Sequence, residues 1–230
     1  MIIYPLVVAV VSAVFAGVVI SQYRARHRAH QLIWSVALVM AFVASLAYVL
    51  AATTHGVLFF SLYYLFGALL MAAYLGMGSI QLFVRPRVAR MYLYPLLVLS
   101  AVGAVAVLAS PVHPAAVAHL HGGPGTHAIA LGPLALILLI LLNSFGAAAV
   151  IIVALLSGWR MHTRSATAGF VRGNVLLAVG VLIISMAGTM ARLGSGGGFW
   201  LTMALGWIVL FAGFVVLNQP QARSGESVRA

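Results

Sequence analysis

Two polar side chains have the chemistry to bind a ligand, one near the middle of a long apolar stretch of the sequence and one at the end of another. Asn143, in "LLILLNSFG", carries an amide with two donors and one acceptor, which must find partners in a dry setting. Arg192, in "GTMARLG", carries a planar guanidinium that suits a carboxylate, a phosphate or a carbonyl group. Two simpler interpretations stay open, a clamp between helices for Asn143 and snorkelling to lipid headgroups for Arg192.

Further candidates come from small and polar residues at helical spacing. Such stripes face other helices, and they are typical of close helix packing as well as of ligand clefts. One stripe consists of Tyr63, Gly67, Leu70, Tyr74, Gly78 and Gln81, and a second of Val181, Ser185, Gly188 and Arg192.

Trp200 and Trp207 stand seven residues apart, and we interpret them as an interfacial anchor and a packed core aromatic rather than a stacking platform. Trp207 stays in the candidate set because its span carries a similar stripe. The candidate ligand-binding residues are therefore Tyr63, Tyr74, Asn143, Ser185, Arg192 and Trp207.

The absent residue types exclude several kinds of chemistry. The sequence has no aspartate, lysine or cysteine, and its one acidic residue is Glu226. An ion-coupled carrier usually keeps a carboxylate within the membrane, and a retinal Schiff base needs a lysine. Paired carboxylates, a triad acid and a thiol nucleophile are also missing. We therefore expect neither an enzyme nor a cofactor-binding protein.

The histidines gather in polar segments, which argues against a haem inside the membrane. Four of them lie in "PVHPAAVAHLHGGPGTHA", namely His113, His119, His121 and His127. Imidazoles bind zinc and copper, but this spacing matches no regular site. The segment therefore predicts a solvated loop and no metal centre.

The composition indicates which elements must position these residues. Hydrophobic residues make up 64% of the chain and charged residues only 6%, which is typical of an integral membrane protein. Each apolar segment is near the roughly 20 residues that an α-helix needs to cross a bilayer. We predict an all-α fold with seven membrane-spanning helices, at about 2–22, 31–53, 57–84, 91–110, 130–157, 170–192 and 198–218.

The charged residues predict the orientation of these helices. Eleven of the twelve arginines fall on one side of the predicted spans, and Arg192 alone falls on the other. The positive-inside rule then puts the N-terminus outside and the C-terminus in the cytoplasm, in an inner (plasma) membrane. We expect the net charge of +11 to attract anionic lipid and not nucleic acid.

Two short stretches resemble each other and indicate a duplication. "SQYRARHR" at residues 21–28 and "SGWRMHTR" at residues 157–164 share Ser, an aromatic and two Arg at the same spacing. Each stretch lies at the inner end of a predicted span that runs inward. The pattern therefore predicts two parallel repeats, 1–84 and 130–218, joined by a linker helix at 91–110. The membrane domain would cover 1–218, with a disordered cytoplasmic tail at 219–230.

This 3+1+3 arrangement resembles the architecture of SWEET-type sugar facilitators, although the Pro-Gln signature of their repeats is missing. The stretches "LYYLFGALLMAAYLGMGSIQLFVRPRVA", "LLNSFG" and "GTMARLG" resemble a set of small bacterial seven-span proteins over nearly the full chain. That resemblance implies topology and no activity.

The sequence therefore predicts a membrane protein that binds a small, mostly apolar ligand in a cleft among the third, fifth, sixth and seventh spans. It would act as a facilitator or a receptor-like sensor. The alternative is an accessory subunit that binds no ligand and docks a cytoplasmic protein partner through its arginine-rich face.

Overall fold

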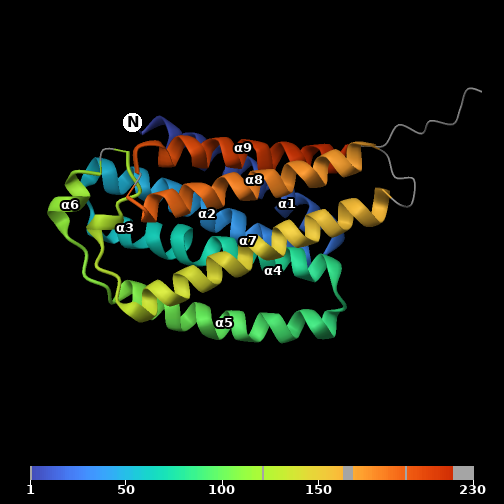
Figure 1. Cartoon of the computed structure of the whole chain (residues 1–230), viewed down its shortest axis with the longest axis horizontal. Coiled ribbons are helices and arrows are strands. Elements are labelled where there is room, and N and C mark those ends of the chain that lie inside the picture. Colours follow the sequence, from blue (N-terminus) through green and yellow to red (C-terminus); the bar gives the residue numbers. More distant parts are fainter. Residues whose placement is uncertain (1, 121, 163–167, 195, 220–230) are drawn as a thin grey trace, which may run out of the picture.

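The computed structural model describes residues 2–120, 122–162, 168–194 and 196–219, and its regular elements are helices (Figure 1). Three short helices lie in loops: α6 (Pro114–Ala118), η2 (Thr126–Ala128) and η3 (Gly196–Gly198). The long elements are α1 (Ile3–Arg26), α2 (Ala29–Thr54), α3 (Val57–Tyr63), which continues through η1 (Tyr64–Leu70) into α4 (Met71–Phe83), α5 (Pro86–Leu108), α7 (Pro133–His162), α8 (Ala168–Arg192) and α9 (Phe199–Asn218).

These elements confirm the predicted seven spans, because seven helices among the described residues are long and apolar enough to cross a membrane. The molecule is therefore a multi-pass membrane protein. The predicted spans ended too early or began too late at the basic turns, because α1 continues to Arg26 and α5 already begins at Pro86. Hydropathy marks the part of a helix that lies in hydrocarbon, whereas the backbone hydrogen bonds continue into the polar interface.

The third span has an irregular centre that its spacing does not predict. Over Tyr64–Leu70 the helix is a π-helix, and the Met71 N–H donates to the Phe66 carbonyl five residues earlier. A π turn shifts the phase of the residues after it relative to those before it. The predicted single face from Tyr63 to Tyr74 and Gln81 assumed an unbroken 3.6-residue period, and that assumption was wrong.

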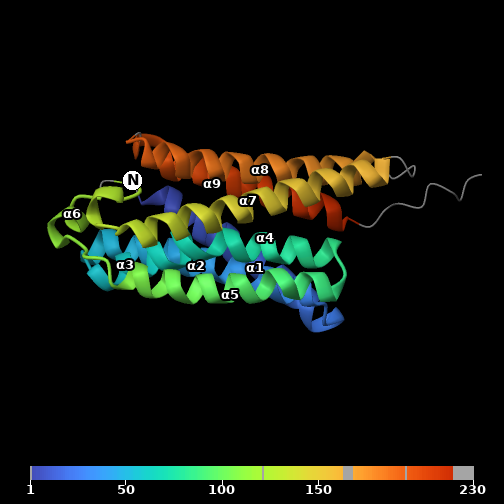
Figure 2. The ribbon, with the colours of Figure 1, turned by 60° about the horizontal axis from the view of Figure 1, so that its bottom comes forward.

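Six spans form a closed cycle of neighbours in the described part of the chain. Along this cycle α1 packs on α2, α2 on α4, α4 on α7, α7 on α8, α8 on α9, and α9 on α1. Helix α5 lies outside the cycle, against α7, α4 and η1 (Figure 2). The predicted repeats thus occupy consecutive positions around the cycle and the linker helix lies beside it, while the duplication itself stays a prediction.

Glycines let the helix backbones touch at two crossings. Between α4 and α7, a Cβ atom on Gly76 would lie 2.6 Å from the Cα atom of Gly146. Between α8 and α9, a Cβ atom on Gly180 would lie 2.6 Å from the backbone nitrogen of Leu210. Such close approach stabilises membrane helices through dispersion contacts, because apolar side chains gain nothing by leaving lipid.

The two ends of the bundle differ in charge. The loop with α6 lies at one end, together with the start of α1. The α1–α2 and α4–α5 turns, the end of α7 and the start of α8 lie at the other (Figure 1). The described arginines of the second end, which we call the arginine end, are Arg24, Arg26, Arg28, Arg85, Arg87, Arg90, Arg160 and Arg172. The predicted tail lies, from residue 220 onward, outside the described residues, as do Arg164, Arg223, Glu226 and Arg229.

Candidate ligand site at the capped end

The connection between α5 and α7 folds over one end of the bundle. We call its described residues, 111–120 and 122–130, the cap. Its two ends pair, since the His113 N–H donates to the Ala128 carbonyl at 2.9 Å and the Ala130 N–H to the Pro111 carbonyl at 2.9 Å. Because these backbone groups are satisfied within the cap, it keeps a defined shape at the membrane surface. The described histidines of this predicted solvated loop, His113, His119 and His127, are exposed. The segment also has buried residues of its own, namely Val117, Leu120, Ala128 and Ile129.

Two tyrosines attach the cap to the helices below. The Tyr48 hydroxyl, from α2, donates to the Gly123 carbonyl at 2.6 Å, and the Tyr63 hydroxyl, from α3, donates to the Pro124 carbonyl at 3.2 Å. Gly125 completes the attachment with a φ of +69°, and a Cβ atom there would lie 2.6 Å from Phe60. Only glycine combines this backbone conformation with such close contact.

Aromatic rings form the floor beneath the cap. The ring centroids of Tyr48 and Tyr63 lie 5.1 Å apart, and those of Tyr48 and Trp200 lie 4.5 Å apart. Phe60 and Tyr64 extend the cluster, with centroids 5.2 Å apart. These contacts join α2, α3 and η1, which follow one another along the chain, to the distant α9. Aromatic pairs at such distances add about 0.5–1.5 kcal/mol each beyond the area that they bury.

Trp200 differs from the predicted interfacial anchor. Its side chain is buried at 3% exposure, and its Nε1 atom has no hydrogen-bond partner among the described residues. An interfacial tryptophan would keep this N–H in the polar headgroup layer. Trp200 is therefore a core residue, packed against Tyr48.

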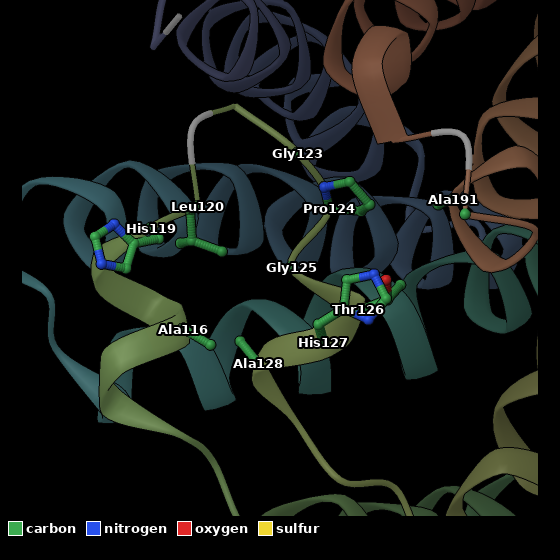
Figure 3. A pocket seen from close by; sticks show the side chains of 11 residues that line it. Ala116, His119, Leu120, Gly123, Pro124, Gly125, Thr126, His127, Ala128 and Ala191 are labelled. Atoms are coloured by element: carbon green, nitrogen blue, oxygen red, sulfur yellow. The ribbon is translucent and has the colours of Figure 1, made fainter.

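A hollow of about 430 Å³ lies between the cap and the last turn of α8. Figure 3 shows Pro124, Thr126 and His127 on the cap side and Ala191 on the α8 side. Its volume lies within the range of small-molecule sites, and a few polar groups among apolar ones are the usual lining of such a site. The remaining lining residues are Ala116, His119, Leu120, Gly123, Gly125, Ala128 and Gly194.

The six predicted site residues do not meet around this hollow. Tyr63 lies in its aromatic floor region, and Arg192 follows the lining residue Ala191 as an exposed residue at the end of α8. Trp207 is buried at 1% exposure in α9, as expected for a packed core aromatic. Tyr74 and Ser185 are half-buried on α4 and α8, and the Ser185 carbonyl accepts a hydrogen bond from Thr189 at 3.0 Å.

Asn143 makes the contact expected of a helix clamp. Its Nδ2 donates to the Ala68 carbonyl at 2.5 Å and to the Leu139 carbonyl at 2.7 Å. Ala68 belongs to the π-helical η1, where the register of backbone bonds is disturbed. The amide of α7 thus supplies a donor to this irregular turn of the third span.

The cap histidines form no metal centre with their described neighbours. No group of three histidine, cysteine or acidic side chains lies close enough to hold an ion in the part of the chain that the structure describes. In Figure 3 His119 and His127 lie apart, on different sides of the cap. The fourth histidine of this segment, His121, lies outside the described residues.

Comparisons with known proteins add no activity to this geometry. The chain matches no family model. Its sequence shows no significant match to a curated protein, and its fold shows none to a solved structure. The assignment of function therefore rests on the chain's own residues.

Sequence reasoning missed Tyr48, Gly125 and Thr126, and it misplaced Trp200. The only signal for Tyr48 was one hydroxyl near the end of an apolar span, and many interfacial tyrosines share that feature. The glycines of "GGPG" indicated a tight turn without showing that it contacts a phenylalanine of another helix. These residues belong together only because the connection folds back across the bundle.

Proposed function

We propose that this protein is a receptor-like sensor, or less favourably a facilitator, that binds a small, mostly apolar ligand in the hollow beneath its cap. The carrying observation is the hollow of about 430 Å³, whose lining residues Gly123 and Pro124 accept hydrogen bonds from the buried Tyr48 and Tyr63. A ring-shaped ligand with one hydrogen-bonding group suits Thr126 and His127 at the rim and the apolar lining beside them. We propose no catalytic role, because the chain has no aspartate and no cysteine, and its one glutamate, Glu226, lies in the predicted tail.

Packing at mid-span favours a sensor over a facilitator. The backbones of α4 and α7 touch at Gly76 and Gly146, and those of α8 and α9 touch near Gly180. Asn143, about one turn before Gly146 on α7, ties this helix to the third span. A conduit would need these contacts to open, whereas a sensor needs only the cap end to respond.

The direction of sensing follows from charge. We propose that the arginine end faces the cytoplasm of an inner (plasma) membrane, so that the cap faces outward. The described polar contacts of the cap run to Tyr48 on α2 and Tyr63 on α3. A ligand that displaces the cap would therefore change the packing of both helices and pass the signal along them.

The absence of cysteine gives a direct test of the hollow. Thr126→Cys places a thiol in its lining, and Ala115→Cys places one on the exposed face of α6 as a matched control. We expect indole, with its apolar ring and single N–H donor, to slow modification of the Thr126→Cys thiol severalfold. The Ala115→Cys rate should not change. Equal rates with and without indole, phenol and benzyl alcohol would remove the ligand proposal.

The alternative function, an accessory subunit, is supported by the charge of the arginine end. An accessory subunit would dock a cytoplasmic protein through the arginine end, where eight described arginines gather without an acidic side chain among the described residues. A photo-crosslinker on Ala29→Cys, which is exposed at this end, would report such a partner in native membranes. A defined protein adduct, together with no protection at Thr126→Cys, would favour this alternative.

A further inference from the structure

A second hollow, of about 360 Å³, lies at the arginine end and far from the cap. It is lined by Arg87, Arg90, Met91 and Tyr94, all from the first turns of α5. All four side chains are exposed, and Met91 and Tyr94 expose 72% and 63% of their surface. This region lies outside the proposed ligand site.

The residues of this hollow continue as an apolar stripe along α5. Arg87, Met91, Tyr94 and Val98 are spaced by four, three and four residues, so they share one face of the helix. Val98 and, two turns further, Val105 expose 62% and 70% of their side chains. The stripe therefore begins with charge and continues with apolar groups.

The opposite face of α5 makes its contacts with the bundle. Leu96, Ser100, Gly103 and Val107 are buried, and a Cβ atom on Gly103 would lie 3.1 Å from Leu69 of η1. Helix α5 lies outside the cycle of the other six spans (Figure 2), and the side chains of its stripe are exposed. In a membrane this stripe meets lipid.

The part of the chain that the structure describes holds no acidic side chain that could pair with the charge of the hollow. The chain has twelve arginines and a single acidic side chain, Glu226, so one carboxylate cannot neutralise the basic end. In the described residues, Arg87 and Arg90 stand near the start of a helix, where the helix dipole adds further positive potential. The counter-charge must therefore come from outside the protein.

We propose that Arg87, Arg90 and Tyr94 bind the headgroup phosphate of an anionic phospholipid, with an acyl chain along Met91 and Val98. Arginine forms two parallel hydrogen bonds to a phosphate, and tyrosine is enriched at the headgroup level of membranes. The eight residue steps from Arg90 to Val98 rise about 12 Å at ~1.5 Å each, which fits within one leaflet, about half of a ~30 Å hydrocarbon core.

Native mass spectrometry of the delipidated full chain tests this site. The protein is titrated with phosphatidylglycerol and, separately, with phosphatidylcholine of the same acyl chains. We expect the wild type to prefer phosphatidylglycerol, and the double variant Arg87→Gln/Arg90→Gln to bind the first phosphatidylglycerol about tenfold more weakly. The matched variant Arg24→Gln/Arg26→Gln removes the same charge from the same end and should keep the preference.

Three results would overturn the proposal. Equal loss in both double variants would mean diffuse attraction to the whole basic end, without a site. Displacement of phosphatidylglycerol by inorganic phosphate at equal concentration would mean a site for a free anion. In native membranes, a photo-crosslinker on Met91→Cys should yield lipid adducts, and adducts with an acidic protein instead would assign the surface to a protein partner.

Discussion

The side-chain amide of Asn143 on α7 donates a 2.5 Å hydrogen bond to the carbonyl oxygen of Ala68, inside the π-helical turn of the third span. The same nitrogen donates to the Leu139 carbonyl of its own helix. One side chain thus joins two helices at a place where the backbone register of one of them changes. Irregular backbone within a membrane persists only where neighbouring groups satisfy it, and Asn143 does so here.

Asn143→Ala should therefore lower the stability of the bundle. Polar bonds between membrane helices contribute about 0.6 kcal/mol on average and up to ~1.7 kcal/mol, and the upper part of this range applies because the Ala68 carbonyl loses a partner in a dry setting. Unfolding of the purified protein in mixed micelles measures the difference.

The exposed neighbour Ser144 provides the control for this change. Ser144→Ala should leave stability unchanged. Protection of the Thr126→Cys thiol by indole should also survive Asn143→Ala, since Asn143 does not line the hollow. Loss of protection with intact stability would instead assign Asn143 to ligand binding.

Gly146→Ala should separate α4 from α7. A Cβ atom at this position would overlap the backbone carbonyl of Ala72, which cannot turn aside as a flexible side chain can. We expect a loss of about 1–3 kcal/mol or more, as for other overpacked sites. Gly188→Ala is the matched change, because a Cβ atom there meets nothing within 4 Å. It should be neutral or slightly stabilising, and equal effects of both variants would contradict the backbone contact.

Tyr48→Phe should loosen the cap without unfolding the helices. The ring keeps its packing, while the hydrogen bond to Gly123 is lost at a cost of about 0.5–1.5 kcal/mol. Faster amide hydrogen exchange confined to residues 122–128 would report this local opening. Tyr94→Phe, on the exposed face of α5, should leave exchange in the cap unchanged. If the amides of residues 122–128 exchange as slowly in Tyr48→Phe as in the wild type, other contacts hold the cap.

Single cysteines will establish the orientation, because the chain has none of its own. In intact cells or right-side-out vesicles, Ala115→Cys in α6 should react with a membrane-impermeant maleimide. Ala29→Cys at the arginine end should react only after the membrane is opened. Both positions are exposed, so burial does not explain a difference. The reverse pattern would place the cap in the cytoplasm and contradict outward sensing.

The seven spans were predictable because each depends on its own segment alone. A run such as 198–218 must satisfy its backbone internally and match the hydrocarbon thickness, whatever the other spans do. The arginines of the α1–α2 and α4–α5 turns lie at the same end for a similar reason. Two membrane spans separate these turns along the chain, so the chain returns to the same side. Both conclusions needed no knowledge of which helices touch.

The candidate site was only partly predictable. Tyr63 was identified from a stripe that assumes one helical period, and the π turn after it breaks that period before Tyr74. The pairing of Asn143 with Ala68 joins residues 75 positions apart, and that of Tyr48 with Gly123 spans the same separation. Local spacing carries no information about such contacts.

The sequence by itself thus determined seven membrane helices, a basic end and the absence of carboxylate and thiol chemistry, because transfer free energy and residue inventory act on each segment separately. Only the tertiary structure decided that α5 lies outside the cycle of spans, that Trp200 is buried, and that the cap closes over Tyr48 and Tyr63. Those arrangements depend on how pairs of helix surfaces fit, in a solvent where lipid is as apolar as the helices themselves.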